Sequence, residues 1–297
     1  MREPIPKVSI VILNWNQKDM TLGCLRSLKK ISYPHYEIIL VDNGSTDDSV
    51  SAVRKEFPEI EIIENSRNLG VAGGRNVGIE HVQQKGTDYL LFLDNDTVVD
   101  EHFITEMVKV GEEDREIGIL TGKIYFYSEP NRIWCAGGSL SLYRRHISAI
   151  GYDEVDRGQY DDLKEVDHVA GCCLMIKKKV IDEIGILDQN FIEYFTEDTD
   201  WCLRTKRRGY KIMYVPNAKL WHHVVKKTSV SERYWYLQGR NMMWLMRKHA
   251  RWHHWIGFSL FLVAAAVRVL YREIKAGNLK QVLRMVKGSL DAFKIKK

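Results

Sequence analysis

The amino-acid sequence predicts an α/β fold, with a doubly wound, mostly parallel sheet over residues 1–225 and a basic helical tail over residues 226–297. In the first region, short apolar runs typical of buried strands alternate with helical segments. Polar residues follow three of these runs, at the ends where doubly wound sheets bind ligands. The tail holds 16 Lys and Arg against three acids, so its net charge is +13 and that of the rest of the +5 chain is −8. Such a division indicates two regions with different partners.

Four strands are expected in the first half of the sheet region, residues 1–116. Continuous apolar runs are typical of strands buried on both faces of a parallel sheet. The predicted strands are 8–13, 36–41, 60–63 and 89–93, with helices over 18–30 and 47–56 and from the glycine-rich segment 68–78 onward. Asn14, Asp42 and Asp94 end three of these strands, so we expect them to converge on one crevice.

The fourth strand ends in Asp94-Asn95-Asp96. Side chains alternate faces along a strand, so Asp94 and Asp96 share one face with Cα atoms roughly 6–7 Å apart. Two carboxylates at this spacing suit Mg²⁺ or Mn²⁺, which prefer oxygen ligands. The alternative is an acidic turn that only closes a strand, because such triplets are common.

The glycine-rich segment 68–78 lacks the spacing of a dinucleotide fingerprint and the Gly-Lys-Ser/Thr of a P-loop. Its small residues let backbone approach a ligand, although tight packing of a helix on the sheet explains the glycines about as well. Packing does not explain Arg75, which lies near a helix start and can meet an anion there.

Residues 117–225 change character and are expected to form a mixed-sheet half that makes the wall for an acceptor. His168 is interpreted there as a buried histidine whose hydrogen bonds are satisfied. A further strand is predicted over 210–216, and His222 follows it. As a neutral ligand, His222 can complete the metal site of the Asp-x-Asp triplet.

A second acidic motif begins at Thr196, which is a good helix N-cap. Asp200 can pair with Arg204 four residues later, which is a sufficient structural role for both. Glu197 and Asp198 have no such partner. At a rigid helix start, a carboxylate is well placed to act as a general base toward a hydroxyl.

In this order, the motifs resemble those of the family 2 glycosyltransferases of the GT-A fold, in particular the rhamnosyltransferase-like members of bacterial surface-polysaccharide assembly. The likeness covers about residues 6–225. It is carried by Val-Ser-Ile-Val-Ile-Leu-Asn-Trp-Asn, Val-Asp-Asn-Gly-Ser-Thr-Asp, Asn-x-Gly-x-Ala-Gly-Gly-Arg-Asn-x-Gly, Leu-Asp-Asn-Asp, Thr-Glu-Asp-x-Asp-x-x-x-Arg and a late Trp-His.

The resemblance implies a role for each motif. The pyrimidine and ribose of a nucleoside diphosphate sugar would be held by Leu13, Asn14, Trp15 and Asp42, with Arg75 close by. Asp94 and Asn95 would contact the donor, and Asp96 would bind Mg²⁺ or Mn²⁺ with His222 as a further ligand. Asp198 would be the catalytic base, with Glu197 its neighbour in the motif.

The implied reaction is an inverting transfer from dTDP-rhamnose or a UDP-sugar to a glycan or lipid-linked acceptor. The metal would neutralise the diphosphate while Asp198 takes the proton of the acceptor hydroxyl. One alternative is a non-catalytic scaffold that binds a nucleotide sugar or a glycan. Another is a sugar nucleotidyltransferase, which the lack of an early Gly-rich loop with Lys or Arg for a triphosphate disfavours.

The five cysteines lack the spacing of a zinc site or a disulfide framework, and no signal peptide is visible at the start. We therefore expect a cytoplasmic protein, held on the inner face of the cell membrane by its tail.

The tail over residues 231–297 interleaves Trp and Tyr with Lys and Arg, which is the composition of a membrane interface. The uncharged run 255–267 is shorter than the about 20 residues of a spanning helix, so it predicts an interfacial or re-entrant segment. Residues 279–293 have the pattern of a basic amphipathic helix suited to an anionic membrane. The alternative is a lid packed on the catalytic region or on a second subunit of a homodimer. No recognition motif accompanies the charge, so no nucleic-acid partner is expected.

Overall fold

The computed structural model describes residues 4–144, 146–192, 196–224, 231–259 and 279–296. Strands and helices alternate through its first half, as the apolar runs predict. In chain order they are β1 Val8–Asn14, α1 Lys18–Leu28, β2 Tyr36–Asp42, α2 Ser49–Glu56, β3 Glu61–Glu64, α3 Gly70–Gln83, β4 Tyr89–Asp94, β5 Thr97–Val99 and α4 Phe103–Glu113.

The second half is mixed, and the tail is helical. The second half contains β6 Ile117–Phe126, β7 Ile133–Cys135, β8 Gly138–Ser141, β9 His146–Ala149, β10 Lys164–Glu165, β11 Cys173–Lys177, α5 Lys178–Ile184, α6 Glu197–Arg207 and β12 Lys211–His222. The tail contains α7 Glu232–His249, α9 Leu279–Asp291 and the 3₁₀ turn η1 Ala292–Lys294.

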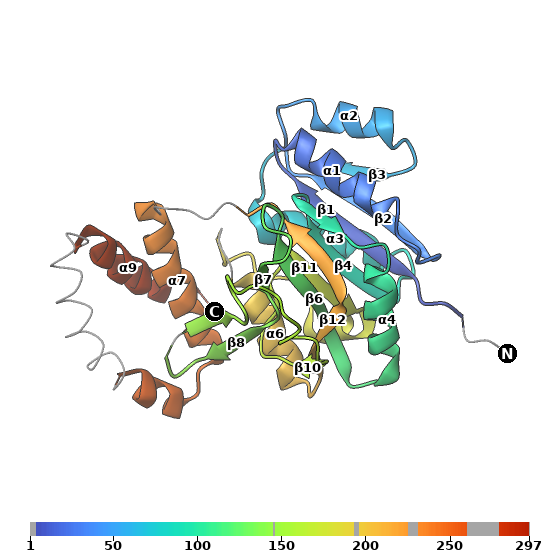
Figure 1. Cartoon of the computed structure of the whole chain (residues 1–297). Helices are drawn as coiled ribbons and strands as arrows, with labels where there is room; N and C mark the ends of the chain where they lie inside the picture. The colour runs from blue at the N-terminus through green and yellow to red at the C-terminus, as the bar shows by residue number, and fades with distance from the viewer. Residues whose placement is uncertain (1–3, 145, 193–195, 225–230, 260–278, 297) are drawn as a thin grey trace.

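The central sheet has the strand order β10-β12-β6-β11-β4-β1-β2-β3, with β5 and β7 added beside β12 and β6 (Figure 1). Helices cover both faces. Ile10 and Ile12 of β1 pack with α1 and α4 on one face, whereas Val11 packs with α3 and α6 on the other. A strand buried on both faces must be apolar throughout, which explains the continuous runs. The predicted doubly wound α/β class is confirmed.

The chain reverses its winding at β1, which pairs in parallel with β2 on one side and β4 on the other. Asn14 lies opposite Asp42, and Leu13 lies opposite Asp94. The expected convergence of the three polar strand ends is therefore confirmed. Ligands of doubly wound sheets bind in the crevice outside such a switch point.

The prediction that the last strand ends at residue 216 was wrong, because β12 continues to His222. Proline cannot donate to a strand ladder, but the register shifts between Val215 and Lys219, so Pro216 lies in a bulge. Gly122 on β6 makes room for it, since a Cβ there would collide with the carbonyl oxygen of Ala218. The continued strand places His222 opposite Thr97 of β5.

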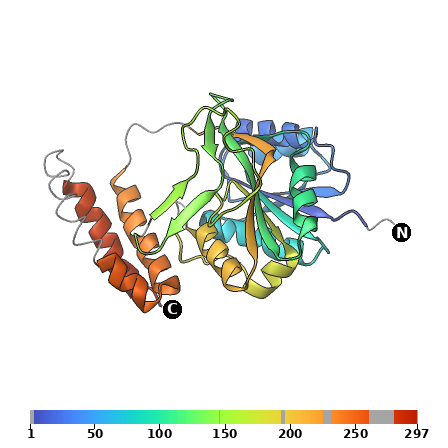
Figure 2. The same cartoon turned by 60° about the horizontal axis from the view of Figure 1, so that its bottom comes forward.

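The tail helices α7 and α9 lie side by side, with the β8–β9 hairpin between them and the main sheet in both views (Figures 1 and 2). Apolar residues of α7, including Met242, Trp244 and Leu245, form a cluster with Phe191 of the sheet region. The packed-lid alternative therefore holds for α7. Residues 252–259 are helical, and the rest of the predicted interfacial segment lies outside the described residues.

Two further features of the described residues concern membrane crossing and the state of the cysteines. Among the residues that the structure describes, no helix combines the length and the apolar content needed to cross a membrane. All five cysteines are buried with free thiols, in accord with the absence of a disulfide pattern.

Candidate active site

A cavity of about 300 Å³ opens at the carboxyl edge of the sheet, between β1 and β4. It brings together most of the predicted site residues. Its wall includes Leu13, Trp15, Arg75, Asp94, Asn95, Asp96, Asp198 and His222. A larger cavity of about 890 Å³ shares Leu13, Trp15 and Val71 with it and runs along the start of α3. The two cavities together form one extended cleft.

Asn14 and Asp42 do not line this cleft but lie buried behind its wall. Asn14 Nδ2 donates to Asp42 Oδ1 at 2.8 Å, and Ser45 Oγ donates to the same oxygen at 2.6 Å. Asn14 Oδ1 accepts a hydrogen bond from Asn95 Nδ2 at 3.2 Å. This network fixes the loops that form the cleft. Direct contact of Asn14 and Asp42 with a donor stays a prediction.

Arg75 is buried, and the anions that it meets are protein carboxylates. Its Nη2 donates to Asp94 Oδ1 at 2.7 Å and to the carbonyl oxygen of Gly171 at 2.9 Å, while Nη1 lies 3.4 Å from Glu197 Oε1. The guanidinium also lies 5.2 Å from the Phe92 ring centroid. Although burial opposes its charge, the Asp94 and Glu197 carboxylates raise the pKa of Arg75. Arg75 therefore joins the end of β4 to the start of α6 as a fixed cation.

Asp198 is the second residue of α6 and is only 2% exposed. Its Oδ2 accepts from the Gly171 backbone N–H at 2.9 Å, and its Oδ1 accepts from the Thr199 N–H at 2.6 Å. Burial raises the pKa of Asp198, although the Arg75 charge opposes the rise. A carboxylate whose pKa is shifted upward is better matched to proton abstraction near neutral pH.

Thr196 occupies the N-cap position of α6, as expected, but its side chain makes no capping hydrogen bond. Glu197 Oε2 instead accepts from the Thr196 N–H at 3.1 Å. Burial and the neighbouring Asp198 charge raise the pKa of Glu197. Glu197 is thus a structural partner of Arg75 and of the helix start.

The predicted metal ligands Asp96 and His222 lie together. Asp96 Oδ1 is 3.0 Å from His222 Nε2. Among the described residues, Asp96 Oδ1 has no partner beyond this contact, and His222 Nδ1 is buried without a hydrogen-bond partner. Although burial opposes its protonation, the Asp96 carboxylate raises the pKa of His222. Carboxylate oxygens beside an imidazole that has an unpartnered nitrogen form a ligand set that fits a divalent cation.

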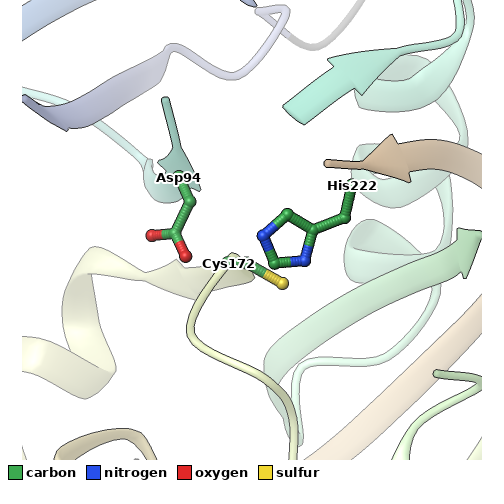
Figure 3. Close-up of side chains that lie close together, drawn as sticks. All are labelled: Asp94, Cys172 and His222. Atoms are coloured by element: carbon green, nitrogen blue, oxygen red, sulfur yellow. The ribbon is translucent and has the colours of Figure 1, made fainter. Parts of the chain in front are cut away.

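Cys172 adds a ligand type that the sequence did not indicate. Asp94, Cys172 and His222 each present one atom to a common point, and these atoms lie within 4.8 Å of one another (Figure 3). Burial raises the pKa of the Cys172 thiol well above its usual value, so the thiol stays protonated. Only a thiolate is a strong ligand, and thiolates select soft metals. The oxygen and imidazole ligands are therefore the ones suited to Mg²⁺ or Mn²⁺.

Asp198 also lines a second cavity, of about 400 Å³, on the side of α7. The two cavities share Trp134, Ala170 and Asp198. His168 lies in the second cavity, where its Nδ1 is 3.2 Å from Thr199 Oγ1, in accord with the interpretation of a satisfied buried histidine. The predicted base thus stands at the boundary between two chambers.

Asp200 is fully buried and joins α6, the helix that carries Asp198, to the tail. It pairs with Arg204 at 2.9 Å, as predicted, but also with Lys248 at 2.8 Å and His249 at 2.7 Å on α7. Although burial opposes ionisation, these partners, His249 first, lower the pKa of Asp200 to about 2. No local pattern predicts this contact, because Arg204 alone already accounts for Asp200.

Comparisons with known proteins identify the family of the chain. Residues 9–185 match the sequence profile of Glycosyl transferase family 2. The chain belongs to this family. It is 25% identical over 218 residues to the poly-β-1,6-N-acetyl-D-glucosamine synthase of Staphylococcus aureus, covering 72% of the chain and 49% of the synthase. It is also 25% identical to the uncharacterised protein y4gI of Sinorhizobium fredii, covering 74% of the chain and 25% of that protein. The family member described here spans half or less of the length of these relatives.

Solved structures share the fold. A mannosyltransferase from Pyrobaculum calidifontis, in complex with GDP-Man and Mn²⁺, has a TM-score of 0.62 at 13% identity and covers 99% of this chain and 89% of its own. GalNAc-T7 with UDP, GalNAc and Mn²⁺ has a TM-score of 0.65 at 17% identity, over 82% and 48% of the two chains. S. aureus TarS in complex with UDP-GlcNAc has a TM-score of 0.58 at 15% identity, over 86% and 71%.

Proposed function

We propose that this chain transfers a sugar from a nucleoside diphosphate donor to a hydroxyl group of a glycan or lipid-linked acceptor in surface-polysaccharide synthesis, with inversion at the anomeric carbon. One observation carries the proposal: Asp198 lies in the wall shared by the cavity of Asp94 and His222 and by the second cavity. A base at that point can face a donor on one side and an acceptor on the other. Membership of the glycosyltransferase family supports the same reaction.

In the proposed step, the oxygen of the acceptor hydroxyl forms a bond to C1 of the donor sugar from one face. The bond from C1 to the diphosphate oxygen breaks on the opposite face, and its electron pair leaves with the nucleoside diphosphate. The hydroxyl proton passes to Asp198. The N–H groups of Gly171 and Thr199 hold this carboxylate in place. A single displacement inverts C1 and needs no protein nucleophile.

The donor is proposed to lie in the extended cleft. Its nucleoside would contact Leu13 and Trp15, with Asn14 and Asp42 behind them, and its sugar diphosphate would approach Asp94 and Asn95. Asp96 and His222 would hold Mg²⁺ or Mn²⁺, which their 3.0 Å contact and the unpartnered His222 Nδ1 support. When bound, the cation would neutralise the charge that develops on the diphosphate leaving group. Arg75 keeps Asp94 in position, because their ion pair is buried on the arginine side.

UDP-N-acetylglucosamine is the first donor to test. The staphylococcal relative is a poly-β-1,6-N-acetyl-D-glucosamine synthase, and a TarS structure holds UDP-GlcNAc. The donor dTDP-rhamnose, which the sequence resemblance implies, is the second.

The function is tested by incubating the full chain with each donor, an acceptor panel and Mn²⁺ or Mg²⁺. We expect release of nucleoside diphosphate that EDTA abolishes, and a product whose anomeric configuration, measured by NMR, is opposite to that of the donor. Retention of configuration would contradict the single displacement. Donor binding without turnover would favour the scaffold alternative. If pyrophosphate is added, formation of a nucleoside triphosphate and a sugar 1-phosphate from the donor would favour a nucleotidyltransferase.

The tail is proposed to contact an anionic membrane at the cytoplasmic face. On α9 and η1, Leu283, Leu290 and Phe293 are 60%, 64% and 54% exposed, and they lie among Lys and Arg. Exposed apolar residues at helical spacing with adjacent cations suit an anionic lipid surface. A homodimer that buries the same face is the competing explanation.

Vesicle sedimentation distinguishes the two explanations. The full chain should sediment with vesicles that contain phosphatidylserine and less with pure phosphatidylcholine. Leu290→Glu should weaken this binding, whereas Leu163→Glu, at an exposed leucine outside the tail, should not. Membrane binding would be refuted if the protein sedimented with neither kind of vesicle and if the wild type eluted as a dimer but Leu290→Glu as a monomer.

A further inference from the structure

The second cavity differs from the donor cleft in its walls. It is lined by residues of the β9 strand of the hairpin, the start of α6 and the helices α7 and α9. Its aromatic residues are Trp134, Tyr234 and Trp235, and α7 supplies the last two. The tail therefore forms part of the chamber that Asp198 faces.

The polar groups of this cavity are almost all uncharged. None of its described lining residues is Lys or Arg. Burial lowers the pKa of His168 to about 4, so this imidazole is neutral at pH 7. Gln238 and Thr199 offer amide and hydroxyl groups. A phosphate or carboxylate would meet no Lys or Arg among these residues, whereas a ligand with hydroxyl groups and apolar faces would find partners for both.

Trp235 lacks a partner that other tryptophans have. The indole N–H groups of Trp201, Trp221 and Trp244 each donate to a protein oxygen. Among the described residues, Trp235 Nε1 is buried without an acceptor. Indole is a donor only, and a buried unpaired donor is costly, so an oxygen brought by a ligand would stabilise it.

The position of α7 relative to the base is held firmly. Asp200, two residues after Asp198, binds Lys248 and His249 of α7. Trp244 Nε1 also donates to Asp188 Oδ2 at 3.0 Å. These buried contacts fix the distance between the aromatic wall and the carboxylate of Asp198.

We propose that the second cavity binds the acceptor as a neutral sugar ring, which packs on Tyr234 and Trp235 and directs one hydroxyl toward Asp198. This inference rests on the proposed function and names the acceptor class for the same site. The reaction is the one given above: the acceptor oxygen bonds to C1, the diphosphate leaves, and the proton goes to Asp198. Charged parts of a larger acceptor lie outside the cavity.

The experiment measures binding of the full chain to an array of neutral, phosphorylated and uronic-acid saccharides, with and without UDP. Wild type should bind neutral saccharides. Trp235→Ala should weaken that binding at least tenfold while the Kd for UDP, measured by calorimetry, stays within twofold. Trp235→Phe, which keeps a ring but loses the N–H, should give an intermediate loss. The matched control is Trp252→Ala, at a tryptophan that is 75% exposed and outside the cavity.

Gln238→Arg, which adds a cation and bulk to the same wall, is the second variant if Trp235→Ala does not fold, and the same loss is expected. Unchanged saccharide binding in the folded variants would overturn the inference. So would a wild-type chain that binds UDP but only phosphorylated or acidic saccharides, or none. A wild-type chain that binds no nucleotide would instead refute the proposed function.

Discussion

Asp200→Asn removes the carboxylate that joins α6 to the tail helix α7. In the wild type, Arg204, Lys248 and His249 surround this buried group and hold its pKa at about 2, against an ordinary 3.8. At about 1.36 kcal/mol per pKa unit, this difference contributes about 2 kcal/mol to the free energy of unfolding at neutral pH. We expect the variant to lose about that much and to unfold at a Tm lower by roughly 5 °C.

The pH dependence provides the sharper part of this test. A carboxyl whose pKa is lowered by folding stabilises the fold above its unfolded pKa, and the contribution fades as the pH falls toward its folded pKa. The stability difference between wild type and Asp200→Asn should therefore be full at pH 7 and shrink below about pH 4, as urea unfolding followed by tryptophan fluorescence would measure.

A matched control is Asp182→Asn, which removes an exposed ion pair with Lys178. Such a pair contributes at most about 0.5 kcal/mol, so the control should unfold nearly as the wild type does. Equal stability of wild type and Asp200→Asn at pH 7, or a stability difference that does not change with pH, would show that the charge of Asp200 does not stabilise the fold.

The pH profile of transfer should follow Asp198. Burial raises the pKa of Asp198 above the ordinary aspartate value of 3.8, so kcat/KM should begin to fall on acidification above pH 3.8. A kcat/KM that stays constant down to pH 3.8 would count against Asp198 as the base. Arg75→Met removes the positive charge that opposes the rise in the pKa of Asp198, so the acidic limb of the profile should move to higher pH. Arg75→Lys should move it less. Identical profiles for wild type and Arg75→Met would exclude an effect of the Arg75 charge on Asp198. Gly239→Ala should separate α7 from α9, since a Cβ there would collide with the Met285 backbone. The amide hydrogen-exchange rates of α9 should then rise. The control Gly23→Ala, on α1 where a Cβ meets no other atom, should leave these rates unchanged. Equal rates in the two variants would refute the close contact between α7 and α9.

The sheet and the crevice could be predicted because their causes are local. A strand buried on both faces is apolar at nearly every position, as residues 8–13, with Ser9 the exception, and 89–93 are. The polar residue after such a run lies at the carboxyl edge of the sheet. The motifs were therefore enough to bring Leu13, Asp94 and Asp198 to one cavity.

The remaining features depend on contacts between distant segments. Asp200 and His249 meet across 49 positions, and the local pair with Arg204 already accounts for Asp200. In the sequence, Cys172 has the character of a small core residue. It comes beside Asp94 because the strand that follows it, β11, pairs with β4 in a register that the sequence does not show. The strand through His222 was missed because Pro216 normally ends a ladder, and its bulge depends on Gly122 of another strand.

We propose that Asp198, between the two cavities, takes the proton of the acceptor hydroxyl. Sugar transfer by Asp198→Asn, measured together with the affinity of this variant for UDP, tests that role. Asparagine has nearly the same shape but cannot accept the proton, so the transfer rate should fall by about 10²–10⁴-fold with UDP affinity unchanged. Transfer at the wild-type rate by Asp198→Asn would exclude Asp198 as the base.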